Sequence, residues 1–419
     1  MLVFGIMFEV FTLIVAVSAL LSYANHKFLK LPPTIGVLIL SIGVSFILGS
    51  LQFINIEWFH QACAVVTTLD FRSILFDFLL SFLLFAGAIH VNLKSLLNER
   101  TPVIILATLG VLISTAITGT IIFLTASSLG LSLTLLQSLI FGSLIAPTDP
   151  VAVLSLLQKA NVKKKLEIKI IGESLFNDGV GIVVFLSLLA IAGGMSHTEG
   201  PVSASSIAES FLVEAGGGIV LGLLLGWLGI FFLKSIKDQP VIEVHITLGI
   251  VMAGYSLASL IGVSGALAMV IAGIMIGNRL AKPDMPKALK DNLNTFWKIL
   301  DEVFNAVLFV LIGLEILVLG FELEYLLLSL IAIPTVLFSR YISVFISNLW
   351  INKNHKSSTK ELAVLTWAGL RGGISIALAL TLNDDLNREP ILYITYSVVL
   401  FSIIIQGLSI EKLVKKLNL

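Results

Sequence analysis

Long apolar stretches follow one another almost from end to end of the chain, and short polar clusters separate them. A helix needs about 20 apolar residues to cross a bilayer, and most of the stretches reach that length. The pattern predicts an all-α polytopic membrane protein with about 13 transmembrane helices, in a single transmembrane domain (1–419) without a soluble domain. The predicted spans are 2–23, 33–51, 73–91, 102–126, 134–158, 169–193, 206–233, 240–261, 264–278, 296–320, 323–349, 361–382 and 390–410.

The Lys and Arg residues fix the predicted direction of these spans. Twenty-two of the 26 basic residues fall in alternate connections, beginning with the one between the first two spans. Basic residues collect in cytoplasmic loops, so we expect the N-terminus outside and the C-terminus in the cytoplasm. The first span has no basic residue before it and no clear cleavage site, so we expect a retained helix rather than a signal peptide.

Composition agrees with the membrane class and narrows the function. Apolar residues make up 57% of the chain and charged residues 12%, about half the charged share of a soluble domain. The formal net charge is zero, which gives no indication of a nucleic-acid partner. A single cysteine, Cys63, excludes an internal disulfide and disfavours a thiolate metal site.

A few charged residues lie inside the apolar spans, where each charge costs at least about 2.5–3.5 kcal/mol on insertion scales. Such residues are candidates for function. They are Asp149, Glu173, Asp178, Glu315, Arg340 and Arg371.

The fifth span is interrupted at Ala146–Pro150, where two prolines enclose Thr148 and Asp149. Proline removes an amide donor and clashes with the preceding turn, so the helix should unwind here. Irregular backbone at membrane depth is tolerated in buried protein or beside a water-filled cavity. A simple kink, with Asp149 capping the following half-helix, is the alternative to an ion site.

The twelfth span carries a similar interruption at Gly369–Gly373, which includes Arg371, Gly372 and Gly373. The twelfth span comes seven spans after the fifth, which is an odd offset, so the two broken helices run in opposite directions. This arrangement predicts inverted repeats at about 2–193 and 240–410, joined by a linker helix at about 206–233. Paired discontinuous helices in inverted halves mark a transport site near the midplane. We expect Arg371 to offset the carbonyl dipoles beside its own break.

The sixth span opens with a polar stripe. Residues four apart share a helix face, so Ser174 lies above Asp178 and Glu173 above Asn177. A hard cation takes several oxygen ligands, which the Asp178 carboxylate, the Ser174 hydroxyl and an oxygen near Thr148 can supply for Na⁺.

Burial makes protonation of a carboxylate competitive with cation binding. A carboxylate that holds either ion predicts a transporter that exchanges one for the other at Asp178. The alternative for Asp178 is a structural ion pair with an intramembrane arginine. For Glu173 we expect such a structural pair, with Arg340. Glu315 has no evident role.

The three motifs Ala146–Val153, Gly172–Gly179 and Gly369–Gly373 together resemble the monovalent cation/proton antiporters of the NhaP and sodium/proton exchanger branch. The resemblance implies an NhaA-like antiporter fold with two crossed, interrupted helices, a homodimer, and a core domain that slides against a dimerisation domain. It implies electroneutral exchange of one Na⁺ (or Li⁺) for one H⁺, because an asparagine precedes the aspartate of the motif. It assigns ion and proton binding to Asp178, with coordination or support from Ser174, Thr148 and Asp149, and it pairs Glu173 with Arg340.

One position departs from that family. Ala86 stands where many relatives have an acidic residue, which leaves the affinity, the pH profile and the choice between Na⁺ and K⁺ open.

Several other functions compete with sodium/proton exchange. They are K⁺/H⁺ exchange, a proton-uncoupled cation channel or uniporter, and an intramembrane protease built on Ser264 of a Gly-x-Ser-Gly sequence. The sequence offers no activating base near Ser264, so we do not expect a protease or another enzyme. We expect no cofactor, and we expect Na⁺ (or Li⁺ or K⁺) and H⁺ to be the transported ions. The expected location is a prokaryotic plasma (inner) membrane, with the lipid bilayer as surroundings.

Overall fold

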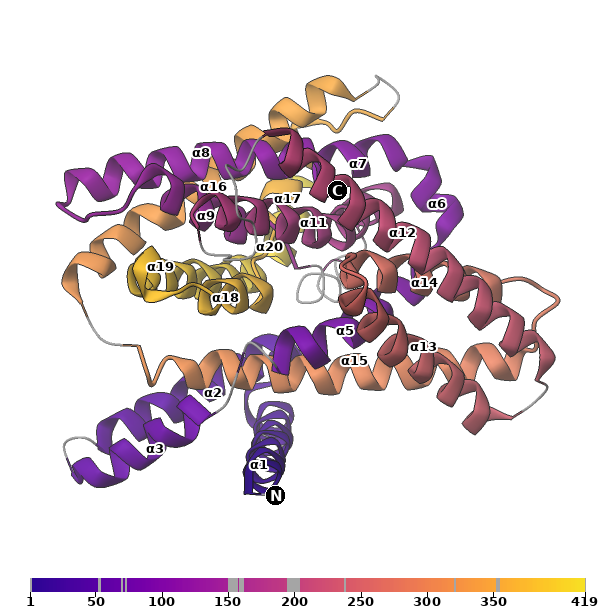
Figure 1. Cartoon of the computed structure of the whole chain (residues 1–419), viewed down its shortest axis with the longest axis horizontal. Coiled ribbons are helices and arrows are strands. Elements are labelled where there is room, and N and C mark those ends of the chain that lie inside the picture. The colour runs from indigo at the N-terminus through magenta and orange to yellow at the C-terminus, as the bar shows by residue number, and fades with distance from the viewer. Residues whose placement is uncertain are drawn as a thin grey trace.

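A computed structural model describes residues 2–51, 54–68, 71, 74–149, 157, 162–193, 204–236, 239–319, 322–351 and 355–418. Every regular element in these residues is helical, as the sequence predicts. Figure 1 shows long helices packed side by side, with shorter ones between them.

The helices are described in chain order. Those before residue 150 are α1 (Leu2–Ala24), η1 (Asn25–Leu29), α2 (Pro33–Ser50), α3 (Ile56–Thr68), η3 (Ile74–Leu79), α5 (Leu80–Ile89), α6 (Leu93–Asn98), α7 (Arg100–Ala107), α8 (Leu109–Ser128) and α9 (Leu135–Ile145). Those after residue 160 are α11 (Lys164–Ile191), α12 (Ala204–Ser235), α13 (Pro240–Leu260), α14 (Gly265–Leu280), α15 (Lys287–Glu315), α16 (Leu323–Trp350), α17 (Thr359–Trp367), α18 (Gly373–Leu380), η4 (Asp384–Leu386), α19 (Arg388–Phe401), η5 (Ser402–Gln406) and α20 (Gly407–Leu417).

Each predicted span overlaps at least one described helix, and two further α-helices, α3 and α6, lie in predicted connections. In the described part of the chain, eight helical runs are long and apolar enough to cross a membrane, and shorter apolar helices lie at Ile74–Ile89, Leu135–Ile145 and Gly265–Leu280. The count of thirteen spans stays a prediction, since most of the second half of the 134–158 span lies outside the described residues. Helix α3 is the longer of these two. Its 13 residues rise only about 20 Å, too little to cross a bilayer.

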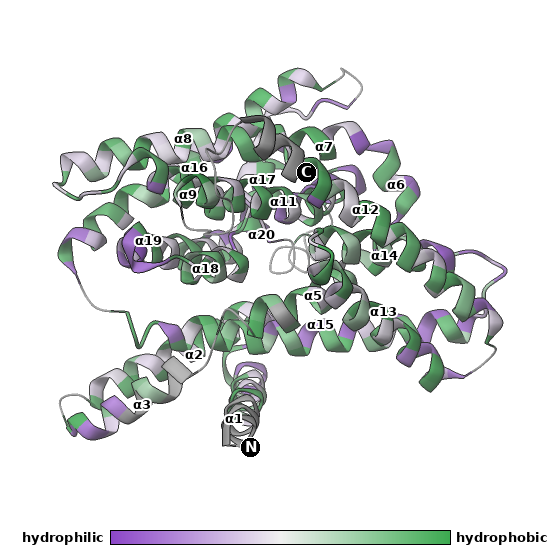
Figure 2. Ribbon diagram, viewed as in Figure 1, coloured by the Kyte–Doolittle hydropathy of each residue, from purple (hydrophilic) through white to green (hydrophobic). Residues whose placement is uncertain are grey.

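The surface of the helices suits a lipid environment. Figure 2 shows apolar residues along most helices and hydrophilic residues concentrated at helix ends and connections. Large apolar side chains stand exposed on α12, where Leu212, Trp227 and Phe231 are all more than half accessible. In water such an apolar face would promote aggregation, whereas in a bilayer lipid tails solvate it.

The buried apolar residues form two clusters that meet at α15. One cluster includes Trp297 of α15 together with residues of α5, α12, α13 and α14. The other includes residues 307–312 of α15 together with residues of α2, α8, α9, α11 and α16 to α20. Helix α15 therefore passes from one cluster to the other, and the segment around residue 305 lies at the boundary.

The two predicted interruptions are present. Helix α9 ends at Ile145 and residues 146–149 leave the helical path, because Pro147 has no amide hydrogen and its ring crowds the preceding turn. Helix α17 ends at Trp367 and α18 begins at Gly373, with an extended segment between them. The long helix α11 continues without a break past both of them.

Candidate functional site

The two interrupted helices are joined to each other by hydrogen bonds between their breaks. The backbone N–H of Asp149 donates to the carbonyl oxygen of Leu370 at 2.8 Å. The guanidinium of Arg371 donates through Nη1 to the carbonyl oxygens of Ala146 and Pro147, the second at 2.9 Å. The carbonyl oxygens that accept hydrogen bonds from Arg371 therefore belong to the α9 break. The sequence analysis expected Arg371 to offset carbonyl dipoles of its own break instead.

Arg371 is held in this position from a third helix. Its backbone N–H donates to Ser402 Oγ at 2.8 Å, and its side chain is almost completely buried. A guanidinium in such a place neutralises carbonyl dipoles that the unwound helix leaves without partners. The break in α9 is thus stabilised by the break between α17 and α18.

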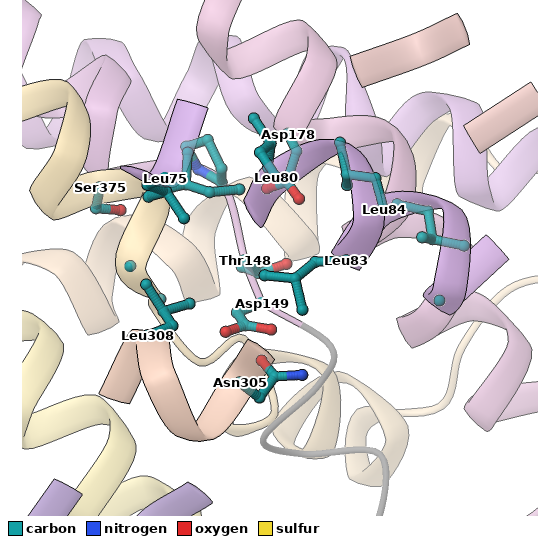
Figure 3. A pocket seen from close by; sticks show the side chains of 16 residues that line it. Leu75, Leu80, Leu83, Leu84, Thr148, Asp149, Asp178, Asn305, Leu308 and Ser375 are labelled. Atoms are coloured by element: carbon teal, nitrogen blue, oxygen red, sulfur yellow. The ribbon is translucent and has the colours of Figure 1, made fainter. Parts of the chain in front are cut away.

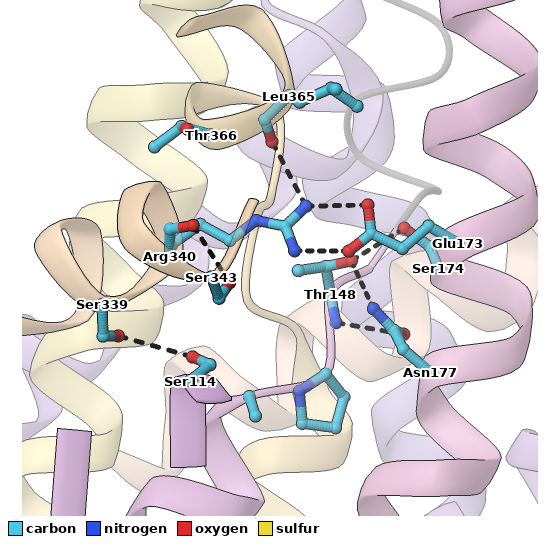
Figure 4. Close-up of polar contacts among 12 residues, drawn as sticks. Ser114, Thr148, Glu173, Ser174, Asn177, Ser339, Arg340, Ser343, Leu365 and Thr366 are labelled. Atoms are coloured by element: carbon cyan, nitrogen blue, oxygen red, sulfur yellow. Dashed lines mark hydrogen bonds and ion pairs between the residues drawn. The ribbon is translucent and has the colours of Figure 1, made fainter. Parts of the chain in front are cut away.

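The polar stripe of α11 faces the α9 break. Asn177 Nδ2 donates to Thr148 Oγ1 at 2.8 Å, and the Thr148 N–H donates back to Asn177 Oδ1 at 3.3 Å. The hydroxyls of Thr148 and Ser174 are hydrogen-bonded at 2.9 Å. All three residues are buried, and Figure 4 shows Ser174 and Asn177 of α11 beside Thr148 of the break. Asn177 therefore fixes the position of Thr148, which in turn fixes the Ser174 hydroxyl.

Glu173 and Arg340 form the ion pair that the sequence predicts. Arg340 Nη2 donates to Glu173 Oε2 at 2.8 Å, and Nη1 donates to Oε1 (Figure 4). Arg340 also donates to the carbonyl oxygen of Leu365 in α17 at 3.2 Å. The side chains of the pair are only 1% and 5% exposed. This bidentate pair joins α11 to α16 and to the end of α17.

Asp178 lies one turn further along α11 and borders a cavity. The cavity has a volume of about 60 Å³ and is also lined by Thr148, Asp149, Gly372 and Gly373. A water needs roughly 10–15 Å³ measured in this way, so there is room for an ion with a few waters. Figure 3 shows the Asp149 and Asp178 side chains in this cavity among leucine side chains.

Asp178 and Glu173 differ in their partners. No ion pair to Asp178 occurs among the described residues, although its side chain is almost fully buried. Both arginines predicted inside the spans are engaged elsewhere, Arg340 with Glu173 and Arg371 with backbone carbonyls. Asp149 lines the same cavity, and its negative charge repels that of Asp178. The alternative of a structural pair between Asp178 and an arginine therefore has no support in the described residues.

Gly372 allows the close approach of the breaks. A Cβ atom at Gly372 would lie 2.5 Å from Asp149 Oδ2 and 2.7 Å from Asp149 Cβ. The backbone of Gly372 is extended, with φ of −121°, so any residue could adopt its conformation. The need for glycine here is one of space.

Sequence reasoning missed two polar residues of the cavity. Asn305 of α15 and Ser375 of α18 both line it and are almost completely buried (Figure 3). The only signal for Asn305 was its position four residues after Asp301 in an apolar span.

Three positions singled out in the sequence lie away from the cavity. Ala86 is buried but is not among the lining residues, whereas its neighbour Gly87 is. Glu315 is the last residue of α15 and is half-buried, and it stays unassigned. Ser264 caps the start of α14 by accepting a hydrogen bond from the Leu267 N–H, which is a structural role.

Comparison with known proteins places nearly the whole chain in one family. Residues 15–416 match the family model described as "Sodium/hydrogen exchanger, transmembrane". The chain is 39% identical to a Na⁺/H⁺ antiporter NhaP from Pseudomonas aeruginosa, over 98% of this chain and 97% of that protein. It is 35% identical to a Na⁺/H⁺ antiporter NhaH from Halobacillus aidingensis, over 94% of each.

The fold also matches a solved structure. The sodium proton antiporter MjNhaP1 from Methanocaldococcus jannaschii at pH 8 superimposes with a TM-score of 0.75, over 100% of this chain and 99% of that one, at 22% identity. The predicted antiporter fold is therefore confirmed.

Proposed function

Since the chain belongs to the sodium/hydrogen exchanger family and is a cation/proton antiporter by that membership, we propose that it exchanges Na⁺ for H⁺ at Asp178. The observation that carries the proposal is a buried carboxylate without a cationic partner among the described residues, bordering a small cavity. A carboxylate in such a place is stabilised either by a proton or by a metal ion, and it cannot hold both.

The oxygen atoms around the cavity supply a Na⁺ site. The carboxylates of Asp178 and Asp149 and the Thr148 hydroxyl reach the same space. The Ser174 hydroxyl is bonded to Thr148 and either supports it or joins the coordination shell. Hard monovalent cations prefer such a set of oxygen ligands, and one or two waters in the cavity complete it.

The charges at the crossing favour an exchange of one ion for one proton. The two breaks, α11 and α16 contribute the carboxylates of Asp149, Glu173 and Asp178 and the guanidinium groups of Arg340 and Arg371. Together they carry one net negative charge when all are ionised. One Na⁺ or one H⁺ neutralises the group, and a neutral group moves through a low-dielectric interior at much lower cost than a charged one. We therefore propose electroneutral 1:1 exchange.

Alternating access is the remaining part of the proposal. Broken helices that cross near mid-span allow the site to face either side after a small movement of one half of the molecule. We assign this movement to the helices of the inverted repeats, about 2–193 and 240–410. We further propose that the protein is a homodimer and that it lies in the bacterial plasma membrane. The N-terminus outside and the C-terminus in the cytoplasm complete the arrangement.

The test is a transport assay on purified protein in proteoliposomes that carry a preformed pH gradient. Added Na⁺ should dissipate the gradient in the parent protein, and Li⁺ and K⁺ series give the cation order. Asp178→Asn should abolish this response while its yield and melting temperature stay close to those of the parent. Asp385→Asn, a change of the same kind at an exposed position, should leave exchange intact.

Two outcomes would count against the proposal. Exchange that persists in Asp178→Asn would remove Asp178 from the mechanism. Passage of Na⁺ without any movement of protons in the parent protein would indicate an uncoupled pathway instead of an exchanger.

A further inference from the structure

Asn305 is a buried polar residue for which the exchange mechanism above has no role. It lies on α15 where that helix passes between the two apolar clusters, and its side chain is 2% exposed. It lines the same cavity as Asp149 and Asp178, from a helix that contributes none of the other candidate ligands. Figure 3 shows it on the Asp149 side of the cavity.

The hydrogen bonds of Asn305 fix which end of its amide faces the cavity. Its Nδ2 donates to the backbone oxygen of Asp301 at 2.8 Å and to Asp301 Oδ1 at 3.0 Å. Both acceptors are oxygens, so a flipped amide would place oxygen against oxygen. Both amide hydrogens are thus used, and Oδ1 points away from Asp301. No donor to this oxygen occurs among the described residues.

Helix α15 is anchored by hydrogen bonds from α2 and by close packing against α18. Ser41 Oγ of α2 donates to the carbonyl oxygen of Val310 at 2.9 Å, and Ser45 Oγ donates to that of Gly313 at 2.7 Å. The contact with α18 is close, because a Cβ at Gly373 would lie 2.7 Å from Leu308 Cδ1. Asn305 is therefore held firmly, on the wall of the cavity that faces the crossing.

We propose that Asn305 Oδ1 is a further ligand of the transported cation, either directly or through one water. The proposal rests on the proposed function and names one more oxygen of that same site. A carbonyl oxygen suits a hard cation and adds no charge. It does not bind a proton near neutral pH, so it strengthens cation binding without changing proton binding at Asp178. Asn305 thereby shifts the competition in favour of the cation.

Competition at one carboxylate gives this proposal a specific kinetic signature. The apparent KM for Na⁺ then equals the intrinsic value multiplied by a factor that depends only on proton concentration and proton affinity. Loss of Asn305 Oδ1 changes the intrinsic value alone. We expect Asn305→Leu to raise KM about tenfold or more at every pH, the size of one hydrogen bond to a charged group. The pH at which protons begin to raise KM should not move.

The experiment measures Na⁺-driven proton movement in proteoliposomes over a Na⁺ series at several pH values. Asn305→Ala, which needs no extra space, should repeat the result for Asn305→Leu, and Asn305→Gln, which keeps an amide oxygen, should recover part of the affinity. Asn294→Leu is the matched control, since it lies on the same helix about 16 Å away and should leave KM unchanged.

The result that overturns the proposal is a KM close to the parent value in both Asn305→Leu and Asn305→Ala, with any loss confined to maximal rate or to the yield of folded protein. Asn305 would then only hold α15. Asp178→Asn measured in parallel separates the two claims. Exchange that persists there refutes the proposed function, whereas an unchanged KM in the Asn305 variants, with Asp178→Asn inactive, refutes the Asn305 assignment alone.

Discussion

Removal of one partner from the buried Glu173–Arg340 pair should destabilise the protein strongly. Arg340→Ala leaves the Glu173 carboxylate, whose side chain is 1% exposed, without its two hydrogen bonds and its counter-charge. It also removes the hydrogen bond to the Leu365 carbonyl. Breaking a buried pair of this kind costs about 3–5 kcal/mol, because the remaining charge is stranded in a low-dielectric interior.

This free energy can be expressed as a shift in melting temperature. The entropy of unfolding of soluble proteins is about 2.1 cal/mol/K per residue, which gives roughly 0.9 kcal/mol/K for a chain of 419 residues. A loss of about 3–5 kcal/mol then lowers the melting temperature by about 3–6 °C. Membrane proteins keep part of their helical structure when they unfold, so their entropy change is smaller and the shift should be at least this large.

The assay is thermal unfolding of purified protein in detergent, followed by intrinsic fluorescence. Glu173→Gln and Arg340→Met should each lower the melting temperature, while the double variant should recover much of the loss, since neither charge is then left alone. Lys415→Ala, which removes an exposed partner of Glu411, is the control and should cost no more than about 1 kcal/mol. Two results would refute the reasoning. One is a double variant whose fall in melting temperature equals the sum of the two single falls, and the other is a fall for Arg340→Ala that is as small as that of the control.

Two further predictions concern the crossing of the interrupted helices. Arg371→Met should lower the yield of folded protein more than Arg371→Lys does, because each charged hydrogen bond to the Ala146 and Pro147 carbonyls contributes about 1.5–3 kcal/mol. Equal melting temperatures for Arg371→Met and the parent protein would contradict this. Gly372→Ala should displace Asp149 and lower the exchange rate. Gly43→Ala is the control and should leave the rate unchanged, because a Cβ at Gly43 has no neighbour within 4 Å. Equal exchange rates for the two variants in a transport assay would contradict the steric argument.

The local part of the site followed from sequence because it depends on spacing along one helix. Glu173, Ser174, Asn177 and Asp178 lie on adjoining faces of α11 by helical periodicity alone, and the structure places them there. The breaks were predictable from proline and glycine, whose backbone limits act locally. The Glu173–Arg340 pair followed from the cost of an intramembrane charge, which demands a partner, and few partners were available.

The parts that sequence could not provide depend on which helices meet. Arg371 serves carbonyls 224 and 225 positions earlier in the chain, and nothing local indicates this. Asn305 lines the cavity because α15 passes beside it, and its only sequence signal was a polar pair four residues apart. Helix α3 went unrecognised because its short, mixed sequence resembles neither a span nor a loop.

The central claim is that one carboxylate holds either a proton or a sodium ion. The most direct test adds Na⁺ to purified, weakly buffered protein at the acidic end of its working range and counts the protons released per Na⁺ bound with a pH indicator. We predict close to one proton per Na⁺ in the parent protein and none in Asp178→Asn. Sodium binding without proton release in the parent, or the same release in Asp178→Asn, would contradict the account.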